Sequence, residues 1–302
     1  MSAAEAQHTR GLDELRAQDA DRFGGKSASL GELLHAGIPV PPGFAISAGA
    51  GGEFTPVSRH DIVMRYRGLG EDAPVAVRSS ALGEDSAEAT FAGQQDTYLW
   101  VRGIDAVCDA VQKCWASLYN PEAVAYRERF HIENPAMGVT VQLMVDAAVS
   151  GVMFTCNPVS GDRSMVAINA SWGLGLAVVG GEVTPDDYLV SKVTGEIVKQ
   201  TVNDKAIEYV HGDDGARRID VEEDRRTASC LDADAIKTLV DIAKRVERHF
   251  GAPQDIEWAF DHDGELFVLQ SRPVTGLAKK EAQTHVPASA MSLIFNKFGA
   301  NR

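Results

Sequence analysis

The segments Asp255-Ile256-Glu257-Trp258 and Leu269-Gln270-Ser271-Arg272-Pro273 concentrate the side chains best suited to hold a metal ion beside a phosphate. Alternation along a strand places Asp255 and Glu257 on one face and turns Ile256 toward a core. Mg²⁺ prefers oxygen ligands that it shares with phosphates, and arginine offers a planar fork of donors to the same oxygens. A carboxylate pair of this spacing is also typical of a hairpin with a solvated charged face, so other segments must decide.

A second candidate is the lysine in Phe23-Gly24-Gly25-Lys26-Ser27. A Walker P-loop requires a glycine five residues before Gly25, and Ala20 stands there. The alternative is a lysine at a helix N-terminus, where backbone N–H groups and a flexible cation together suit a phosphate. A plain turn is the simpler explanation of this segment taken alone.

A third candidate is the apolar strand Val75-Ala76-Val77-Arg78-Ser79-Ser80, which ends in an arginine and two hydroxyls. It is followed by Thr90-Phe91-Ala92-Gly93-Gln94-Gln95-Asp96-Thr97, whose glycine turn can aim successive N–H groups at an anion. Both segments therefore add phosphate-binding groups to the set.

The elements that must position these groups alternate between helix and strand. Residues 26–36 predict a helix ended by Gly37, and residues 104–118 predict another. A strand at 137–145 and a hairpin partner at 150–156 come next. Apolar residues from Ile236 to Phe250 form a one-face helical pattern that ends at Gly251 and leads into the Asp255 strand. This order favours an α+β protein with antiparallel sheets.

Taken together, these segments resemble the N-terminal nucleotide-binding domain shared by phosphoenolpyruvate synthase, pyruvate phosphate dikinase and rifampicin phosphotransferase, an ATP-grasp domain. Further matching segments extend the resemblance over most of the chain: Gly37–Phe44, Cys114–Leu118, Val141–Val145, Ser150–Thr155 and Trp172–Gly175. The resemblance implies an α+β, two-lobed ATP-grasp fold with mixed or antiparallel sheets. It places the first lobe at residues 1–141, the second at 142–275 and a C-terminal tail at 276–302.

The resemblance also implies a role for each candidate residue toward ATP and Mg²⁺. Lys26 and Arg78 would hold the ATP phosphates from the first lobe, and the turn at Gly93, Gln94 and Gln95 would cover them. Gln142, Met144 and Val145 would receive the adenine at the hinge between the lobes. Glu257 and Gln270 would carry Mg²⁺, with Asp255 beside them and Arg272 on a terminal phosphate. Lys26, Arg78 and Arg272 would be the catalytic residues.

Composition bounds the class of protein. The chain has 302 residues with 29 Lys and Arg against 43 Asp and Glu, a net charge of −14. This balance argues against nucleic-acid binding, and it requires cations to be concentrated locally if ATP is to bind. The four cysteines show no C-x-x-C pairing, and we find neither a signal peptide nor an apolar run of roughly twenty residues for a membrane span. A cytoplasmic protein is the default expectation.

The related full-length enzymes carry a swivelling domain whose histidine accepts phosphate from ATP, and the chain stops shortly after Thr275. We therefore expect the ATP-cleaving subunit of a split dikinase-type enzyme, with the histidine on a partner polypeptide that serves a small-molecule acceptor. Phenylphosphate synthase is divided in this way, with phenol as acceptor. Two alternatives stay open: a self-sufficient small-molecule kinase, and a non-catalytic ATP-sensing or scaffolding module.

The tail contains a short apolar cluster, Met291-Ser292-Leu293-Ile294-Phe295. Chain termini are usually disordered unless they are tied down, and four large apolar residues are poorly placed in water. The cluster either packs on the surface of its own domain or docks on the histidine-bearing partner.

Overall fold

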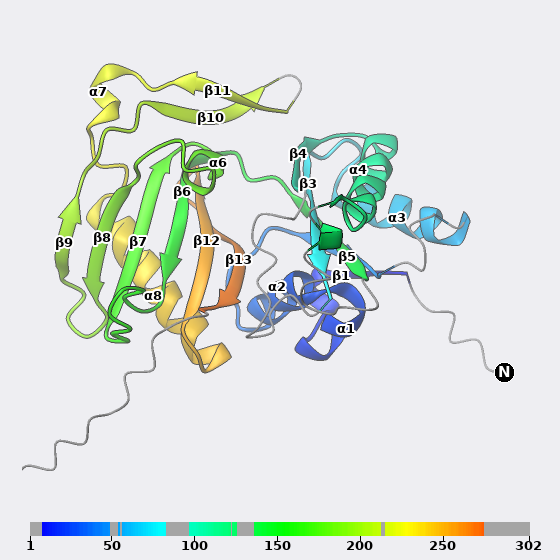
Figure 1. Ribbon diagram of the computed structural model, residues 1–302, viewed down its shortest axis with the longest axis horizontal. Helices are drawn as coiled ribbons and strands as arrows, with labels where there is room; N and C mark the ends of the chain where they lie inside the picture. Colours follow the sequence, from blue (N-terminus) through cyan, green and yellow to red (C-terminus); the bar gives the residue numbers. More distant parts are fainter. Residues whose placement is uncertain are drawn as a thin grey trace, which may run out of the picture.

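The computed structural model describes residues 8–48, 54, 56–82, 97–121, 123–125, 136–212 and 215–274. Its strands form two main sheets and a separate hairpin (Figure 1). In spatial order, the first sheet consists of β1 Thr9–Gly11, β2 Gly43–Ile46, β5 Met137–Leu143, β3 Val75–Ala81 and β4 Thr97–Val101. The second consists of β13 Leu266–Pro273, β12 Gln254–Asp261, β6 Ala147–Phe154, β7 Met165–Trp172, β8 Asp186–Ser191 and β9 Ile197–Thr201. The hairpin pairs β10 Ile207–Gly212 with β11 Gly215–Asp220.

Helices cover these sheets (Figure 1). They are η1 Leu12–Glu14, η2 Ala17–Asp19, α1 Ala20–Phe23, α2 Gly25–His35, α3 Pro56–Leu69, α4 Ile104–Ser117, α6 Leu176–Val179, α7 Glu223–Arg226 and α8 Ala233–Phe250. Neighbouring strands of each sheet pair antiparallel. The predicted α+β class with antiparallel sheets is confirmed. Within the described residues, no helix combines the length and the apolar character needed to cross a membrane.

Helix α8 shows how the sequence builds the second core. The Asp232 side chain accepts a hydrogen bond from the Ala235 N–H at 2.8 Å and so caps the helix. Gly251 ends it at φ +70°, a left-handed conformation that favours glycine. Between these caps, one apolar face that includes Leu239 and Val246 packs under the second sheet against Ile256. The predicted helix and its end at Gly251 are confirmed.

The first sheet has its own core, built mainly with α4. Apolar side chains of α4, among them Val111 and Cys114, pack against Val77 and Val139 of the central strands. This packing fixes the direction of β3, the strand that carries Arg78.

One prediction from the sequence is wrong. Strands β5 and β6 are not hairpin partners, because β5 pairs with β2 and β3 whereas β6 pairs with β12 and β7. The connection at residues 144–146 passes from one sheet to the other instead of turning back. A short loop between two apolar strands looks the same in sequence whether or not those strands pair.

The N-terminal segment reaches across to the last strand of the second sheet. The Ser29 hydroxyl donates to the Ser271 carbonyl at 2.8 Å, and the Val268 N–H donates to the Pro39 carbonyl at 2.8 Å. Leu30 and Leu33 belong to the same buried cluster as Val268. The division into lobes at residues 1–141 and 142–275 remains a prediction, and the tail at 276–302 lies outside the described residues.

The hairpin β10–β11 contacts both halves of the molecule (Figure 1). On the second sheet's side, the Leu174 N–H donates to the Tyr209 carbonyl at 2.8 Å. On the first sheet's side, the His211 ring lies 4.0 Å from the Trp100 ring, centroid to centroid. Trp100 has φ +59°, unusual for a residue other than glycine, beside a register shift between β3 and β4. This irregularity accompanies the Trp100–His211 contact.

Candidate active site

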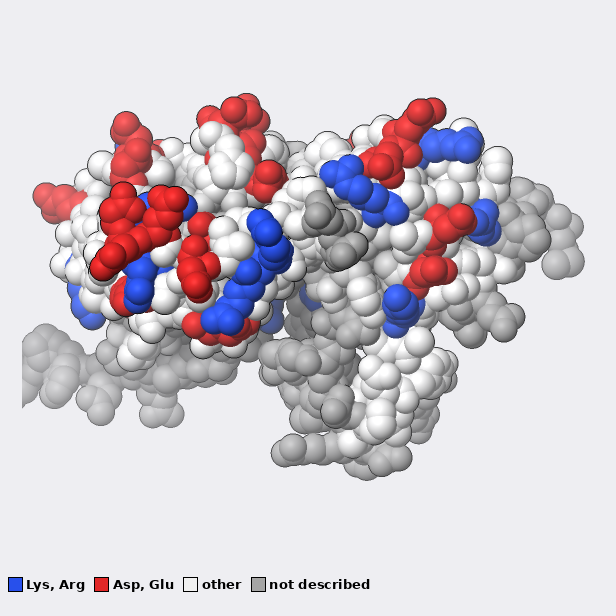
Figure 2. All heavy atoms as spheres, turned by 90° about the horizontal axis from the view of Figure 1, so that it is seen from above, with Lys and Arg blue, Asp and Glu red and all other residues white. Residues whose placement is uncertain are grey.

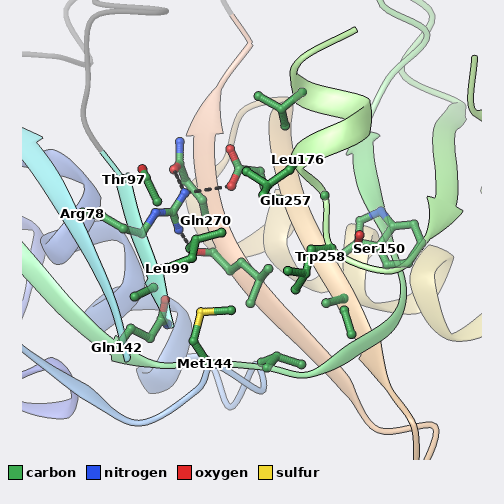
Figure 3. Close-up of a pocket in the computed structure, with 18 of the residues that line it drawn as sticks. Arg78, Thr97, Leu99, Gln142, Met144, Ser150, Leu176, Glu257, Trp258 and Gln270 are labelled. Carbon is green, nitrogen blue, oxygen red and sulfur yellow. Dashed lines mark hydrogen bonds and ion pairs between the residues drawn. The ribbon is translucent and has the colours of Figure 1, made fainter. Parts of the chain in front are cut away.

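A cleft of about 630 Å³ is lined by residues of both main sheets. Ala76 comes from β3 and Val152 comes from β6. Figure 3 shows Arg78 of β3 and Glu257 of β12 in the same cleft. The volume falls within the range of roughly 300–1,000 Å³ that is typical of small-molecule sites. Convergence of two sheets on one cleft is what the predicted two-lobed arrangement requires.

The cleft gathers most of the residues that the sequence singled out. Of the predicted site residues that the structure describes, all but Asp255 line it: Lys26, Arg78, Gln142, Met144, Val145, Glu257, Gln270 and Arg272. The predicted phosphate-covering turn at Gly93, Gln94 and Gln95 lies outside the described residues. The role of each residue remains a prediction.

Arg78 forms the centre of the polar end of the cleft. Its Nη2 donates to Glu257 Oε2 at 2.8 Å and to Gln270 Oε1 at 2.7 Å. Its Nη1 donates to the Leu269 carbonyl at 2.8 Å. These acceptors lie on β12 and β13, which pair Glu257 directly with Gln270. Arg78 therefore bridges the first sheet to the second.

One donor of the same guanidinium has no acceptor among the described residues. Arg78 Nε is buried and makes no hydrogen bond to any described residue. Leaving a buried donor unpaired typically costs about 1–3 kcal/mol, more for a charged group. A ligand oxygen in the cleft is the chemical group that would satisfy it.

Lys26 reaches the cleft because of the two glycines before it. Gly24 has φ +86°, and a Cβ there would lie 2.1 Å from the Ser80 hydroxyl, so only glycine allows the start of α2 to approach β3 this closely. Lys26 is the second residue of α2, as expected of a lysine at a helix N-terminus, and its Nζ donates to the Ser79 carbonyl at 3.2 Å. Gly24 thus allows Lys26 to lie next to the strand that carries Arg78.

Asp255 and Arg272 form a separate pair at the edge of the cleft. Arg272 Nε and Asp255 Oδ2 are 2.9 Å apart, and the two residues face each other across β12 and β13. Burial raises the pKa of the Asp255 carboxyl, while the Arg272 guanidinium opposes that shift. Asp255 is thus paired with Arg272 and does not line the cleft, whereas Arg272 binds Asp255 and also lines the cleft.

The oxygens of the two predicted metal ligands, Glu257 and Gln270, lie close together in the cleft. Glu257 Oε2 and Gln270 Oε1 both accept from one nitrogen atom, so two hard oxygens already converge on a cation. That donor set suits Mg²⁺, which binds few protein ligands and completes its shell with phosphate and water. Within the described residues, no group of three or more His, Cys, Asp or Glu side chains gathers as a metal site. The two residues fit an ion that is shared with a nucleotide.

The opposite end of the cleft is apolar. Val145 belongs to a buried cluster with Trp100, Leu174 and Ala259. Gln142 is buried beside it and donates from Nε2 to the Pro41 carbonyl at 3.3 Å. An apolar slot with a few polar groups suits a planar base. The contribution of Leu174 to this lining was missed from the sequence, because no periodic pattern links it to the hinge.

Positive charge is concentrated in the cleft as predicted. Its lining contains three cations, Lys26, Arg78 and Arg272, and one carboxylate, Glu257. The chain as a whole carries −14. On the outer face above the hairpin and α7, basic and acidic side chains are interspersed (Figure 2). A polyanion therefore meets net positive charge inside the cleft.

Comparison with known proteins identifies relatives by sequence. The "Probable phosphoenolpyruvate synthase" of Methanothermobacter thermautotrophicus is 38% identical over 323 residues, covering 91% of this chain and 47% of that protein. The "Prodigiosin synthesizing transferase PigC" of Serratia marcescens is 39% identical over 287 residues, covering 85% of this chain and 32% of that protein. The chain thus spans half or less of the length of these two relatives. A solved acetyl-coenzyme A synthetase of Ca. Korarchaeum cryptofilum aligns over 86% of this chain and 96% of its own, with 13% identity and a TM-score of 0.45.

The family assignment rests on a match that spans most of the chain. Residues 52–292 match the family described as "Pyruvate phosphate dikinase, AMP/ATP-binding domain". This span contains Arg78, Glu257, Gln270 and Arg272, which meet at the polar end of the cleft. The chain belongs to the family of pyruvate phosphate dikinase AMP/ATP-binding domains.

Proposed function

We propose that the cleft binds Mg·ATP and that the chain transfers a phosphoryl group from it to a histidine on a partner polypeptide. The partner would then pass the phosphate to a small-molecule acceptor. One observation carries this proposal: Arg78, Glu257 and Gln270 converge from two sheets on one point of a cleft that also contains Lys26 and Arg272.

The chemistry of the lining supports phosphoryl transfer. This reaction depends mainly on positioning and on neutralising charge, with a metal ion that bridges phosphate oxygens. Mg²⁺ held by Glu257 and Gln270 would supply part of that neutralisation, and Lys26, Arg78 and Arg272 would supply the rest. The described lining includes no histidine and no cysteine. A histidine acceptor would therefore come from outside this lining.

In this proposal, the identity of the small-molecule acceptor is determined by the partner polypeptide. Relatives of nearly equal identity carry the names phosphoenolpyruvate synthase and prodigiosin synthesizing transferase, so this nucleotide-binding region serves proteins of different names. The resemblance to the divided phenylphosphate synthase makes phenol the first acceptor to test.

The test follows labelled phosphate from ATP onto protein. The chain is incubated with Mg²⁺, ATP labelled at the β- or γ-phosphate and the polypeptide that co-purifies with it. We expect protein-bound phosphate that is labile to acid and stable to base, as a phosphohistidine is. Glu257→Gln should lower the labelling rate by at least about 10²–10³-fold, because it removes the charged metal ligand.

A matched control is Glu265→Gln, an exposed glutamate in the turn between β12 and β13. It removes the same charge from the same hairpin and should label the partner at the wild-type rate. Full labelling by Glu257→Gln would refute the metal assignment. Phosphorylation of a small molecule by the chain alone would favour the self-sufficient kinase, and ATP binding without cleavage in the partner's presence would favour the sensing module.

A further inference from the structure

The Arg78 guanidinium binds the same two oxygen atoms that are assigned to the metal ion. Its Nη2 lies 2.8 Å from Glu257 Oε2 and 2.7 Å from Gln270 Oε1, the two oxygens assigned to Mg²⁺ above. Figure 3 shows the side chain extending from β3 toward Glu257 and Gln270. One protein cation thus already uses both oxygens.

Arg78 and a divalent ion compete for these oxygens. A lone pair that accepts from an N–H is not free to coordinate a metal, and two cations at neighbouring positions repel each other in a half-buried site. The Arg78 side chain is 13% exposed and that of Glu257 is 30% exposed, so water screens the repulsion only in part.

We propose that Arg78 is a displaceable internal cation that closes the metal site in the nucleotide-free chain, so that a divalent ion enters only with nucleotide phosphates. This inference rests on the proposed function for the identity of the incoming anion. Phosphate oxygens offer the guanidinium a forked set of acceptors. They also offer an acceptor to the buried Nε, which has none among the described residues. Arg78 can therefore exchange its present partners for phosphate without losing hydrogen bonds.

The exchange also affects the contact between the sheets. The three hydrogen bonds that the Arg78 side chain makes to described residues run from β3 in the first sheet to β12 or β13 in the second. When phosphate takes over the guanidinium, these direct links are replaced by links through the ligand. Nucleotide binding, metal entry and the spacing of the sheets are then coupled at one side chain.

The test measures metal binding without nucleotide. Mn²⁺ is the probe, and its free concentration is followed by electron paramagnetic resonance in the presence of the full chain. Wild-type protein should bind Mn²⁺ weakly, and Arg78→Met should bind it at least about tenfold more tightly, because the competing cation is gone. The gain should disappear in the Arg78→Met, Glu257→Gln double variant.

Lys26→Met is the matched control. It removes one positive charge from the lining of the same cleft, at a side chain whose Nζ donates to the Ser79 carbonyl of β3 at 3.2 Å. A smaller gain than in Arg78→Met supports site competition. An equal gain in Lys26→Met, or a gain in Arg78→Met that survives Glu257→Gln, would overturn the proposal.

A measurement on wild-type protein covers the case in which Arg78→Met does not fold. The affinity for Mn²⁺ is measured with and without a non-hydrolysable ATP analogue. We expect the protein and the analogue together to bind Mn²⁺ more tightly than the analogue does alone. Equally tight Mn²⁺ binding at the same site without nucleotide would contradict the inference. Neither measurement requires a partner or ATP cleavage. Failure of phosphoryl transfer to a partner would therefore leave the Mn²⁺-binding result, and with it this inference, unaffected.

Discussion

Lys205 and Asp186 form an ion pair whose two side chains have no exposed surface. Lys205 Nζ lies 2.6 Å from Asp186 Oδ1, and the other carboxylate oxygen accepts from the Cys230 N–H at 3.0 Å. The Asn203 N–H also donates to Asp186, at 2.9 Å. This single carboxylate thus ties the start of β8 to two segments that follow β9 and α7.

Removal of one partner should destabilise the protein strongly. Lys205→Ala leaves the Asp186 charge buried without its cation, a change that typically costs about 3–5 kcal/mol in free energy of unfolding. Urea denaturation followed by circular dichroism measures the loss. Lys199→Ala, on the exposed strand β9, is the control and should change stability by less than about 0.5 kcal/mol. A loss of similar size in both variants would show that the pair contributes nothing specific.

Single residues differ in how far the sequence predicts their positions. Glu257 and Gln270 pair across β12 and β13, and the prediction that they lie on neighbouring strands follows from their short separation in sequence. The Lys205 contact with Asp186 could not be predicted, since no local rule brings together residues from separate segments. The same limit applies to Arg78. The sequence shows a residue suited to bind phosphate, but it does not show the hydrogen bonds that Arg78 makes to the second sheet.

The β10–β11 hairpin contacts the cleft-lining residue Leu174 and also Trp100 of the first sheet. Tyr209 holds Leu174, which lines the cleft, and its hydroxyl donates to Glu182 Oε1 at 2.9 Å just after α6. His211 packs on Trp100, whose neighbour Leu99 also lines the cleft. Displacement of the hairpin should therefore change both walls of the apolar end.

We expect the Trp100 contact to contribute measurably to this junction. His211→Ala should lower the free energy of unfolding by about 0.5–1.5 kcal/mol, the usual worth of an aromatic pair beyond its buried area. It should also alter the Trp100 fluorescence. His211→Phe keeps a ring at the position and should retain most of the stability, as measured by chemical denaturation. Equal losses in the two variants would mean that ring packing is not what the hairpin contributes.

Elements with caps and a strong period were predictable, and connections between sheets were not. Asp232, Gly251 and the apolar face of α8 are all local signals, and the helix follows them. The β5–β6 connection was misread because pairing depends on partners distant in sequence, such as Gly43 for Gln142 and Trp258 for Gly151. Trp100 escaped notice because a β-bulge has no reliable residue signature.

At the scale of the whole molecule, Glu32 links three segments. Its carboxylate accepts from the Ala17 N–H at 2.9 Å and lies 2.8 Å from His249 Nε2 on α8. Burial alone would raise the pKa of the Glu32 carboxyl, but the Ala17 N–H and the His249 ring together hold it below its usual value of 4.5. A carboxylate with a lowered pKa stabilises the folded state above its unfolded pKa, and that contribution is lost as the pH falls through the folded pKa.

Glu32→Gln should therefore show a pH-dependent defect. Near pH 6 the variant should be less stable than wild type by about 0.5–1 kcal/mol, a value typical of a partly exposed ion pair. The difference should shrink as the pH falls below 4.5. Parallel urea titrations across this range provide the measurement, with Glu71→Gln at an exposed position as control. A defect that stays constant with pH would assign the effect to shape and not to charge.

The contact between the N-terminal segment and β13 affects how this protein folds during its synthesis on the ribosome. Leu30 and Leu33 are synthesised early, yet the strand they pack against, with Val268, is among the last of the described elements to appear. Until β13 has been synthesised, those apolar side chains lack the part of their native packing that Val268 provides. Contacts of such long sequence separation form late and slowly, and surface left open meanwhile is prone to aggregation. The nascent chain is thus most dependent on chaperones until Ser271 has left the exit tunnel.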